Sequence, residues 1–94
     1  MTFISDPNKA RINQRDHKAG FDLAQEVWKD PFHIIAWDRF IDGEERWHAI
    51  GMVGQATLLL VVHTYPGDGE RIVRIVSARR ATSFERRRYE QDGV

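Results

Sequence analysis

Four segments rich in β-branched and aromatic residues follow one another through the middle of the chain, with only short turns between them. The segments are residues 32–40, 46–53, 57–65 and 71–78, and the turns fall at Asp42-Gly43, Gly54-Gln55 and residues 66–69. Glycine, proline and aspartate are typical of such turns. Because strands joined by short turns usually lie side by side, the sequence predicts an antiparallel meander of about four strands.

Helical signals precede these strands. Asp6-Pro7 predicts the start of a helix, since aspartate caps free amides and proline suits the first helical position. This helix is expected to end near His17, ahead of the stop signal at Gly20. A second, short helix is expected over residues 21–29, with one apolar side, and Asp30-Pro31 ends it.

A third helix is expected after the last strand. Thr82 and Glu85 stand in the Thr-x-x-Glu relation of a capping box, which predicts a helix over residues 82–91. The fold class is therefore α+β: two N-terminal helices, an antiparallel meander of about four strands and a C-terminal helix. With 94 residues, the chain is expected to form one domain, residues 1–94.

Several classes of protein are disfavoured by what the chain lacks. It has no cysteine, so a disulfide framework, a thiol nucleophile and a cysteine-based zinc site are excluded. Its histidines, His17, His33, His48 and His63, show no recognisable ligand spacing, so no metal site is expected. No glycine-rich loop opens a helix, and no cofactor is expected. The longest apolar run, residues 58–62, is too short to cross a membrane, and no signal peptide precedes it, so we expect a cytoplasmic protein.

Charge is distributed unevenly, although the formal net charge is zero. Residues 71–88 hold seven of the fourteen basic residues, with only Glu85 opposing them, whereas residues 38–45 carry four acids and Arg39. Such asymmetry is typical of a binding site, here one for an anion. A solvated helix face is the simpler explanation of the same pattern.

Three basic positions could meet at one end of the sheet. His63 ends one predicted strand, Arg46 begins another, and Arg79-Arg80 form the corner between the last strand and the last helix. If these strands are neighbours, the side chains could converge there.

Motifs along most of the chain match a known family. They are D-P-x-K-A-x-x-N at residues 6–13, H-K-x-G-F-x-x-A and D-P at residues 17–31, D-G-E-E-R at residues 42–46, V-V-H-T at residues 61–64, and the long I-x-S-A-R-R-A-T-x-x-E-R-R-x-Y-E motif at residues 75–90. This pattern resembles the BrnT family of bacterial type II toxins. One departure is Ser5, where the family usually has a tryptophan before the first aspartate, and it concerns local packing more than chemistry.

The resemblance implies a RelE-like fold and a ribonuclease that blocks translation until a cognate antitoxin, BrnA, neutralises it. RNA, with or without the ribosome, and the antitoxin are therefore the expected partners. A dimer or a toxin–antitoxin heterotetramer is the expected assembly.

Metal-independent RNA cleavage needs a base for the 2′-hydroxyl, positive groups for the phosphate and an acid for the leaving 5′ oxygen. By comparison with RelE-like enzymes, Arg79, Arg80 and Tyr89 are expected at the phosphate, because arginine binds phosphate oxygens in pairs. His63 is the predicted proton carrier, since imidazole titrates near neutrality. The predicted RNA-binding residues are Arg46, Lys9, His17, Arg86 and Arg87.

Each assignment has a structural alternative. Arg79 and Arg80 could pair with Glu85 or with the acidic segment, Tyr89 could anchor the last helix on the sheet, and His63 could be a satisfied buried histidine. The whole protein could be a non-catalytic binding module that acts in a toxin–antitoxin repressor complex. A general RNA-binding protein is disfavoured, because the tryptophans, Trp28, Trp37 and Trp47, are expected in the core and not on a stacking surface.

Overall fold

One mixed sheet of five strands forms the centre of the computed structural model, which describes residues 1–67 and 69–92. The strands are β1 (Thr2–Ser5), β2 (Ile34–Ile41), β3 (Glu44–Val53), β4 (Thr57–Thr64) and β5 (Ile72–Arg80), and their order in the sheet is β1-β5-β4-β3-β2. The neighbours from β2 to β5 are antiparallel, which is the predicted meander. Asp68, within the predicted turn at residues 66–69, lies outside the described residues.

The fifth strand corrects the prediction of about four antiparallel strands. β1 pairs with β5 in parallel, with Thr2 opposite Ile72 and Ser5 opposite Ile75. Its four residues are too few to show a periodicity, and its partner lies at the far end of the chain. It is also the strand that carries Ser5 to the start of the first helix.

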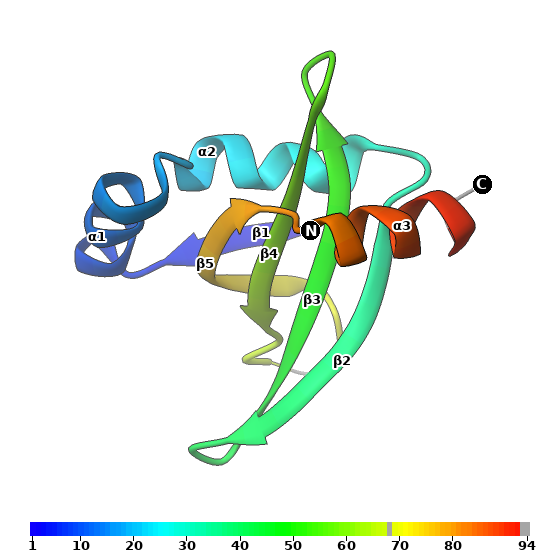
Figure 1. Cartoon of the computed structure of the whole chain (residues 1–94). Coiled ribbons are helices and arrows are strands. Elements are labelled where there is room, and N and C mark those ends of the chain that lie inside the picture. Colours follow the sequence, from blue (N-terminus) through cyan, green and yellow to red (C-terminus); the bar gives the residue numbers. More distant parts are fainter. Residues whose placement is uncertain (68, 93–94) are drawn as a thin grey trace.

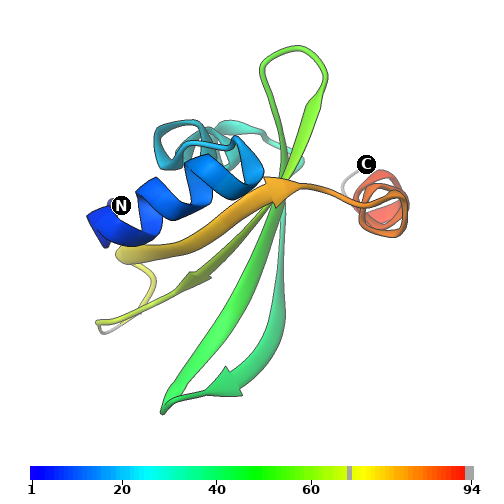
Figure 2. The same ribbon diagram turned by 60° about the vertical axis from the view of Figure 1, so that its left-hand side comes forward.

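Helices cover both faces of the sheet (Figures 1 and 2). Helix α1 (Pro7–His17), the short helix α2 (Phe21–Ala24) and the 3₁₀ helix η1 (Gln25–Lys29) lie on one face, and α3 (Ser83–Asp92) lies on the other. The second helix was predicted as one continuous element, but it tightens into 3₁₀ geometry after Ala24. None of the helices in the described part of the chain is long and apolar enough to cross a bilayer.

The two faces have separate apolar cores. Val27, Leu59, Val61 and Ile75 belong to the larger one, beneath α2 and η1. Gly51 allows η1 to approach β3 closely, because a Cβ there would lie 2.8 Å from the Val27 Cγ1 atom. The smaller core, on the other face, is built by Ile50, Leu58, Leu60 and Tyr89.

The β2–β3 hairpin extends away from the helices (Figure 1). Asp42 and Gly43 at its tip both have positive φ angles, 53° and 77°, as a two-residue type I′ turn requires. This tight turn lets β3 begin at Glu44, two residues earlier than predicted. Trp37, which was expected in the core, is 54% exposed on this hairpin, because the helices do not reach that part of β2.

Asn13 joins the first helix to the last strand. Its side chain is 4% exposed. The Nδ2 group donates to the carbonyl oxygens of Ala19 and Ala78, at 2.7 and 2.8 Å, and Oδ1 accepts from the Ala78 amide at 3.0 Å. These three bonds use both N–H donors of the carboxamide and one of the two acceptor sites on its oxygen, so Asn13 fixes the turn after α1 against the end of β5.

We predict that Asn13→Ala lowers the free energy of unfolding by about 2 to 4 kcal/mol, because it leaves the buried Ala78 amide and two carbonyl groups without partners. Urea unfolding followed by circular dichroism measures this loss. The control is Asn8→Ala, at an exposed position on the same helix, for which we expect a change within about 0.5 kcal/mol. An equal, small effect of both substitutions would contradict the structural role given to Asn13.

Candidate active site

Arg79 and Arg80 lie in the last two positions of β5 and not in a corner after it, which corrects the prediction from sequence. Arg79 is opposite Leu60 on β4, and Arg80 is opposite Leu59. Because successive strand residues point to opposite faces, the two arginine side chains lie on opposite faces of the sheet. Arg79 faces α3, whereas Arg80 faces the side covered by α1 and α2.

The predicted convergence of the arginine pair with His63 and Arg46 is wrong. His63 is opposite Ile75 of β5, four residues before Arg79, and Arg46 lies next to the Trp47–His63 pair. Four residues span about 13 Å along a strand. The sheet therefore holds His63 and Arg46 near one end and the two arginines near the other.

His63 is fully buried and satisfied within the protein. Its Nδ1 group donates to the Val61 carbonyl at 3.2 Å, and its Nε2 atom accepts from the Tyr65 hydroxyl at 3.0 Å. The Trp28 ring packs edge-on against it, with ring centroids 5.0 Å apart. Burial, with a smaller contribution from the charge of His48, lowers the pKa of His63 to about 4. These contacts match the structural alternative for His63, a neutral histidine of the core.

Arg79 holds the start of α3 to the sheet. Its Nη1 and Nη2 groups donate to the two carboxylate oxygens of Glu85, at 2.8 and 2.9 Å. Glu85 also accepts from the Thr82 amide at 2.8 Å, and the Thr82 hydroxyl accepts from the Glu85 amide, so the predicted capping box is confirmed. The hydrogen bond from Arg79, helped by those at Thr82 and opposed by partial burial, lowers the pKa of Glu85 to about 2.

Tyr89 anchors the same helix further along. Its ring lies in the smaller core at 8% exposure, and its hydroxyl donates to Oδ2 of Asp30. Asp30 also accepts from the amides of Met52 and Phe32, at 2.8 and 2.9 Å. Burial, then the hydrogen bond to Asp30 and its charge, raise the pKa of Tyr89 to about 12. This arrangement is the anchor role that was set out as the alternative for Tyr89.

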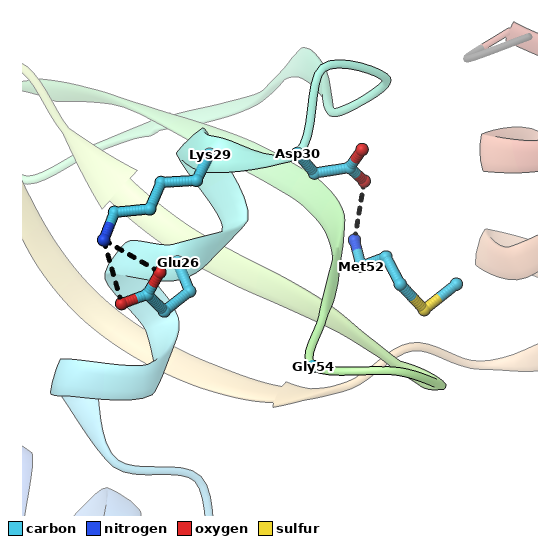
Figure 3. A pocket seen from close by; sticks show the side chains of 5 residues that line it. All are labelled: Glu26, Lys29, Asp30, Met52 and Gly54. Atoms are coloured by element: carbon cyan, nitrogen blue, oxygen red, sulfur yellow. Dashed lines mark hydrogen bonds and ion pairs between the residues drawn. The ribbon is translucent and has the colours of Figure 1, made fainter.

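A hollow of about 440 Å³ beside Asp30 has paired charges (Figure 3). Lys29 binds both carboxylate oxygens of Glu26, at 3.2 and 3.1 Å, and Asp30 is occupied as just described. The charged side chains of this hollow are therefore already paired within the protein and are poorly placed to bind a ligand.

A second hollow, of about 250 Å³, gathers basic groups from separate segments. We call it the basic hollow, and it is lined by His17, Lys18, Ala19, Leu23, Thr57, Leu59 and Arg80. His17 ends α1, Lys18 caps that helix with a φ of 54°, and Arg80 ends β5. All three are exposed, and Arg80 makes no ion pair with any residue that the structure describes. The Asn13 bonds to Ala19 and Ala78 join the end of α1, which carries His17 and Lys18, to the end of β5, which carries Arg80.

The other predicted RNA-binding residues lie elsewhere. Lys9 is in the first turn of α1, eight residues or about 12 Å from His17, and it lines a hollow with Arg74. Arg86 and Arg87 are exposed on α3, on the opposite face from Arg80. Arg46 is half-buried in β3, opposite Arg39. Among the hollows described for residues 1–67 and 69–92, the basic hollow brings together two of the predicted site residues, His17 and Arg80.

Lys18 is the site residue that the sequence analysis missed. A signal existed, because Lys18 directly follows the helix that ends at His17 and directly precedes the Ala19-Gly20 stop. Its proximity to Arg80 could not be inferred, since it depends on contacts between residues 65 positions apart. In residues 1–67 and 69–92, no group of three or more His, Asp or Glu side chains is arranged to hold a metal ion.

Comparisons with known proteins give a family and a fold. The family model described as the ribonuclease toxin, BrnT, of type II toxin-antitoxin systems matches residues 6–85. The crystal structure of the ribonuclease toxin BrnT of Brucella abortus is similar, with a TM-score of 0.63 and 23% sequence identity over 88% of this chain and 99% of that chain. A comparison with curated proteins gives no match.

The Arg79–Glu85 pair predicts a dependence of stability on pH. Because the folded state lowers the pKa of Glu85 from its ordinary 4.5 to about 2, its stabilising contribution is present above about pH 4.5 and is lost as the pH falls towards 2. The difference in free energy of unfolding between the natural protein and Glu85→Gln should shrink over that range, as urea titrations at pH 7, 4.5 and 3 would measure. Glu90→Gln, at an exposed position of the same helix, is the control. A difference that stays constant down to pH 3 would show that the pair does not hold α3.

Proposed function

The chain belongs to the BrnT family of ribonuclease toxins of type II toxin–antitoxin systems, and from this premise we propose that it cleaves RNA at the basic hollow without a metal ion. One observation carries the proposal: His17, Lys18 and Arg80 line a single hollow and are all exposed. Cleavage by the neighbouring 2′-hydroxyl requires a base and positive groups at the phosphate, and these residues supply both.

Arg80 is the proposed phosphate ligand. Arginine stays charged and donates two parallel hydrogen bonds to phosphate oxygens. Arg80 is free to do so, whereas the guanidinium of Arg79 is already engaged by both oxygens of Glu85.

His17 is the proposed base. It takes the proton of the 2′-hydroxyl, whose oxygen then attacks the adjacent phosphorus, and the bond from phosphorus to the 5′ oxygen breaks. The products are a 2′,3′-cyclic phosphate and a 5′-hydroxyl, and solvent supplies the proton for the leaving oxygen because the hollow is open to water. His17 replaces His63 in this role, since His63 has no exposed surface on which to meet a substrate.

Lys18 offsets an unfavourable feature of the location. The C-terminal end of a helix carries a partial negative charge, which repels an approaching phosphate by about 0.3 to 1 kcal/mol. The ammonium group of Lys18 at the cap of α1 neutralises that end, and with Arg80 it makes the hollow attractive to RNA.

The proposed partner is a protein antitoxin of the BrnA type. An antitoxin that masks Arg80 and its neighbours would stop cleavage, because a covered cation cannot bind the phosphate. Release of the antitoxin would restore cleavage, and cleavage of messenger RNA would inhibit translation.

We predict that Arg80→Ala lowers the rate of RNA cleavage by about 10²- to 10³-fold, because it removes the main stabilisation of charge on the phosphate. The assay is cleavage of an end-labelled RNA in EDTA, with and without ribosomes. Arg86→Ala, which removes the same charge from the opposite face, is expected to change the rate by less than about threefold.

The reverse order of these two effects would place the chemistry on the α3 face. If the natural protein cleaves no RNA under any of these conditions but still binds its antitoxin, it is a binding module and not a nuclease.

We predict a loss of about 10²-fold in cleavage rate for His17→Ala, since it removes the proposed base. Arg15→Ala is the matched control, because Arg15 is an exposed basic residue of the same helical turn that does not line the hollow. Unchanged cleavage by His17→Ala, in protein with a normal circular dichroism spectrum, would remove His17 from the mechanism.

A further inference from the structure

A cluster of aromatic side chains lies where the β2–β3 hairpin meets the end of β4, on the face of the sheet that carries α1, α2 and η1. Phe40, Trp47 and Tyr65 line a hollow of about 280 Å³ with Gly43, Glu44 and Glu45, and we call it the aromatic hollow. The rings of Trp47 and Tyr65 are held edge to face, with centroids 6.0 Å apart. The Tyr65 hydroxyl is fixed by its bond to buried His63, so one wall of the hollow is preorganised.

Exposed apolar surface continues from this hollow along β2. Trp37 is paired across the strands with Trp47 and is 54% exposed, and Phe40 is 65% exposed. Ile35, two residues before Trp37 and on the same face of the strand, is 38% exposed. β2 is also the edge of the sheet, so its outer main-chain groups are open to a further strand.

The charge around the hollow is negative. Glu45 is exposed and has no ion-pair partner among the residues that the structure describes, and Glu44 shares its carboxylate with Arg74. Glu70 is a third carboxylate that acts on this site. Burial, and then the negative charge of Glu70, raise the pKa of Tyr65. Carboxylates beside aromatic faces attract a cation and repel a phosphate, so the hollow suits a basic side chain and disfavours RNA.

We propose that the aromatic hollow binds an arginine or lysine side chain of the antitoxin, carried by an extended segment that adds to the sheet along β2. The segment's main chain pairs with the open edge, its apolar side chains cover Trp37 and Phe40, and its cation lies between Trp47 and Glu45. This inference rests on the proposed pairing of the chain with an antitoxin.

The aromatic hollow is separate from the basic hollow. Tyr65 and Leu59, which line the two, are six residues apart, or about 20 Å along β4. The β2 segment therefore anchors the antitoxin without touching Arg80, and another part of the antitoxin must reach the basic hollow. Substitutions at the anchor should weaken the complex and leave cleavage by the free toxin unchanged.

The test uses ¹⁵N-labelled toxin and a capped six-residue peptide of alternating arginine and isoleucine. We expect saturable shifts of the indole resonances of Trp37 and Trp47, with the Trp28 indole unmoved, and no shifts with the matched glutamate–isoleucine peptide. Glu45→Lys should weaken peptide binding at least tenfold. Glu90→Lys, with the same change of charge on α3, should not. Calorimetry should likewise show that Glu45→Lys weakens the complex with the cognate antitoxin and that Glu90→Lys does not.

Three results would overturn the proposal: no shift of these resonances at millimolar peptide, equal binding by Glu45→Lys, or shifts caused by a six-residue oligouridine instead. Changes with toxin concentration alone would make a second copy of the chain the occupant. Cleavage assayed in parallel separates the two proposals, because a toxin that binds the peptide but cleaves no RNA contradicts only the nuclease.

Discussion

The carboxamide of Asn13 makes three hydrogen bonds that join segments 65 residues apart, and the geometry of the basic hollow depends on them. Two of the bonds fix the Ala78 peptide group, directly before Arg79 and Arg80. The third fixes the Ala19 carbonyl, directly after His17 and Lys18. A hydrophobic contact could not hold the turn after α1 and the end of β5 in one register in this way, because the buried peptide groups need hydrogen-bond partners of their own. A single side chain therefore links the stability of the fold to the position of the groups that would bind RNA.

The alternation of side chains along β5 divides the arginine pair between two tasks. Arg79 faces α3 and is held by Glu85, while Arg80 faces the opposite side and has no ion-pair partner within residues 1–67 and 69–92. The strand places adjacent residues on different faces, so the concentration of charge seen in the sequence does not produce a single basic surface. Part of it fixes the C-terminal helix, to which Tyr89 and Asp30 add a second attachment.

Local signals in the sequence predicted most elements correctly. The Thr82–Glu85 capping box, the Asp6-Pro7 helix start and the Asp42-Gly43 turn each depend on residues within one turn of the chain. The four-residue β1 was missed because its partner β5 lies far along the chain. The end of β5 was assigned to a corner, although Arg79 and Arg80 still pair with Leu60 and Leu59 of β4.

The site was harder to predict for the same reason. His63 was chosen because of its residue type, but its burial and its bond with Tyr65 are tertiary properties. Trp37 was assigned to the core because tryptophan is usually buried, whereas the hairpin carries it beyond the helices. His17 and Arg80 were named from the sequence, but their proximity depends on tertiary contacts, among them the bonds of Asn13 and the packing of Ala19 and Ala78 in one core.

The central claim is that RNA binds on the face that carries Arg80 and not on the face that carries α3. A titration of ¹⁵N-labelled toxin with a short RNA blocked by 2′-O-methyl groups, which cannot be cleaved, tests it most directly. The account predicts that the amide resonances of Lys18, Ala19, Thr57 and Arg80 shift together with one saturation curve. Shifts confined to Phe84, Arg86 and Arg87, with the basic hollow unchanged, would contradict it.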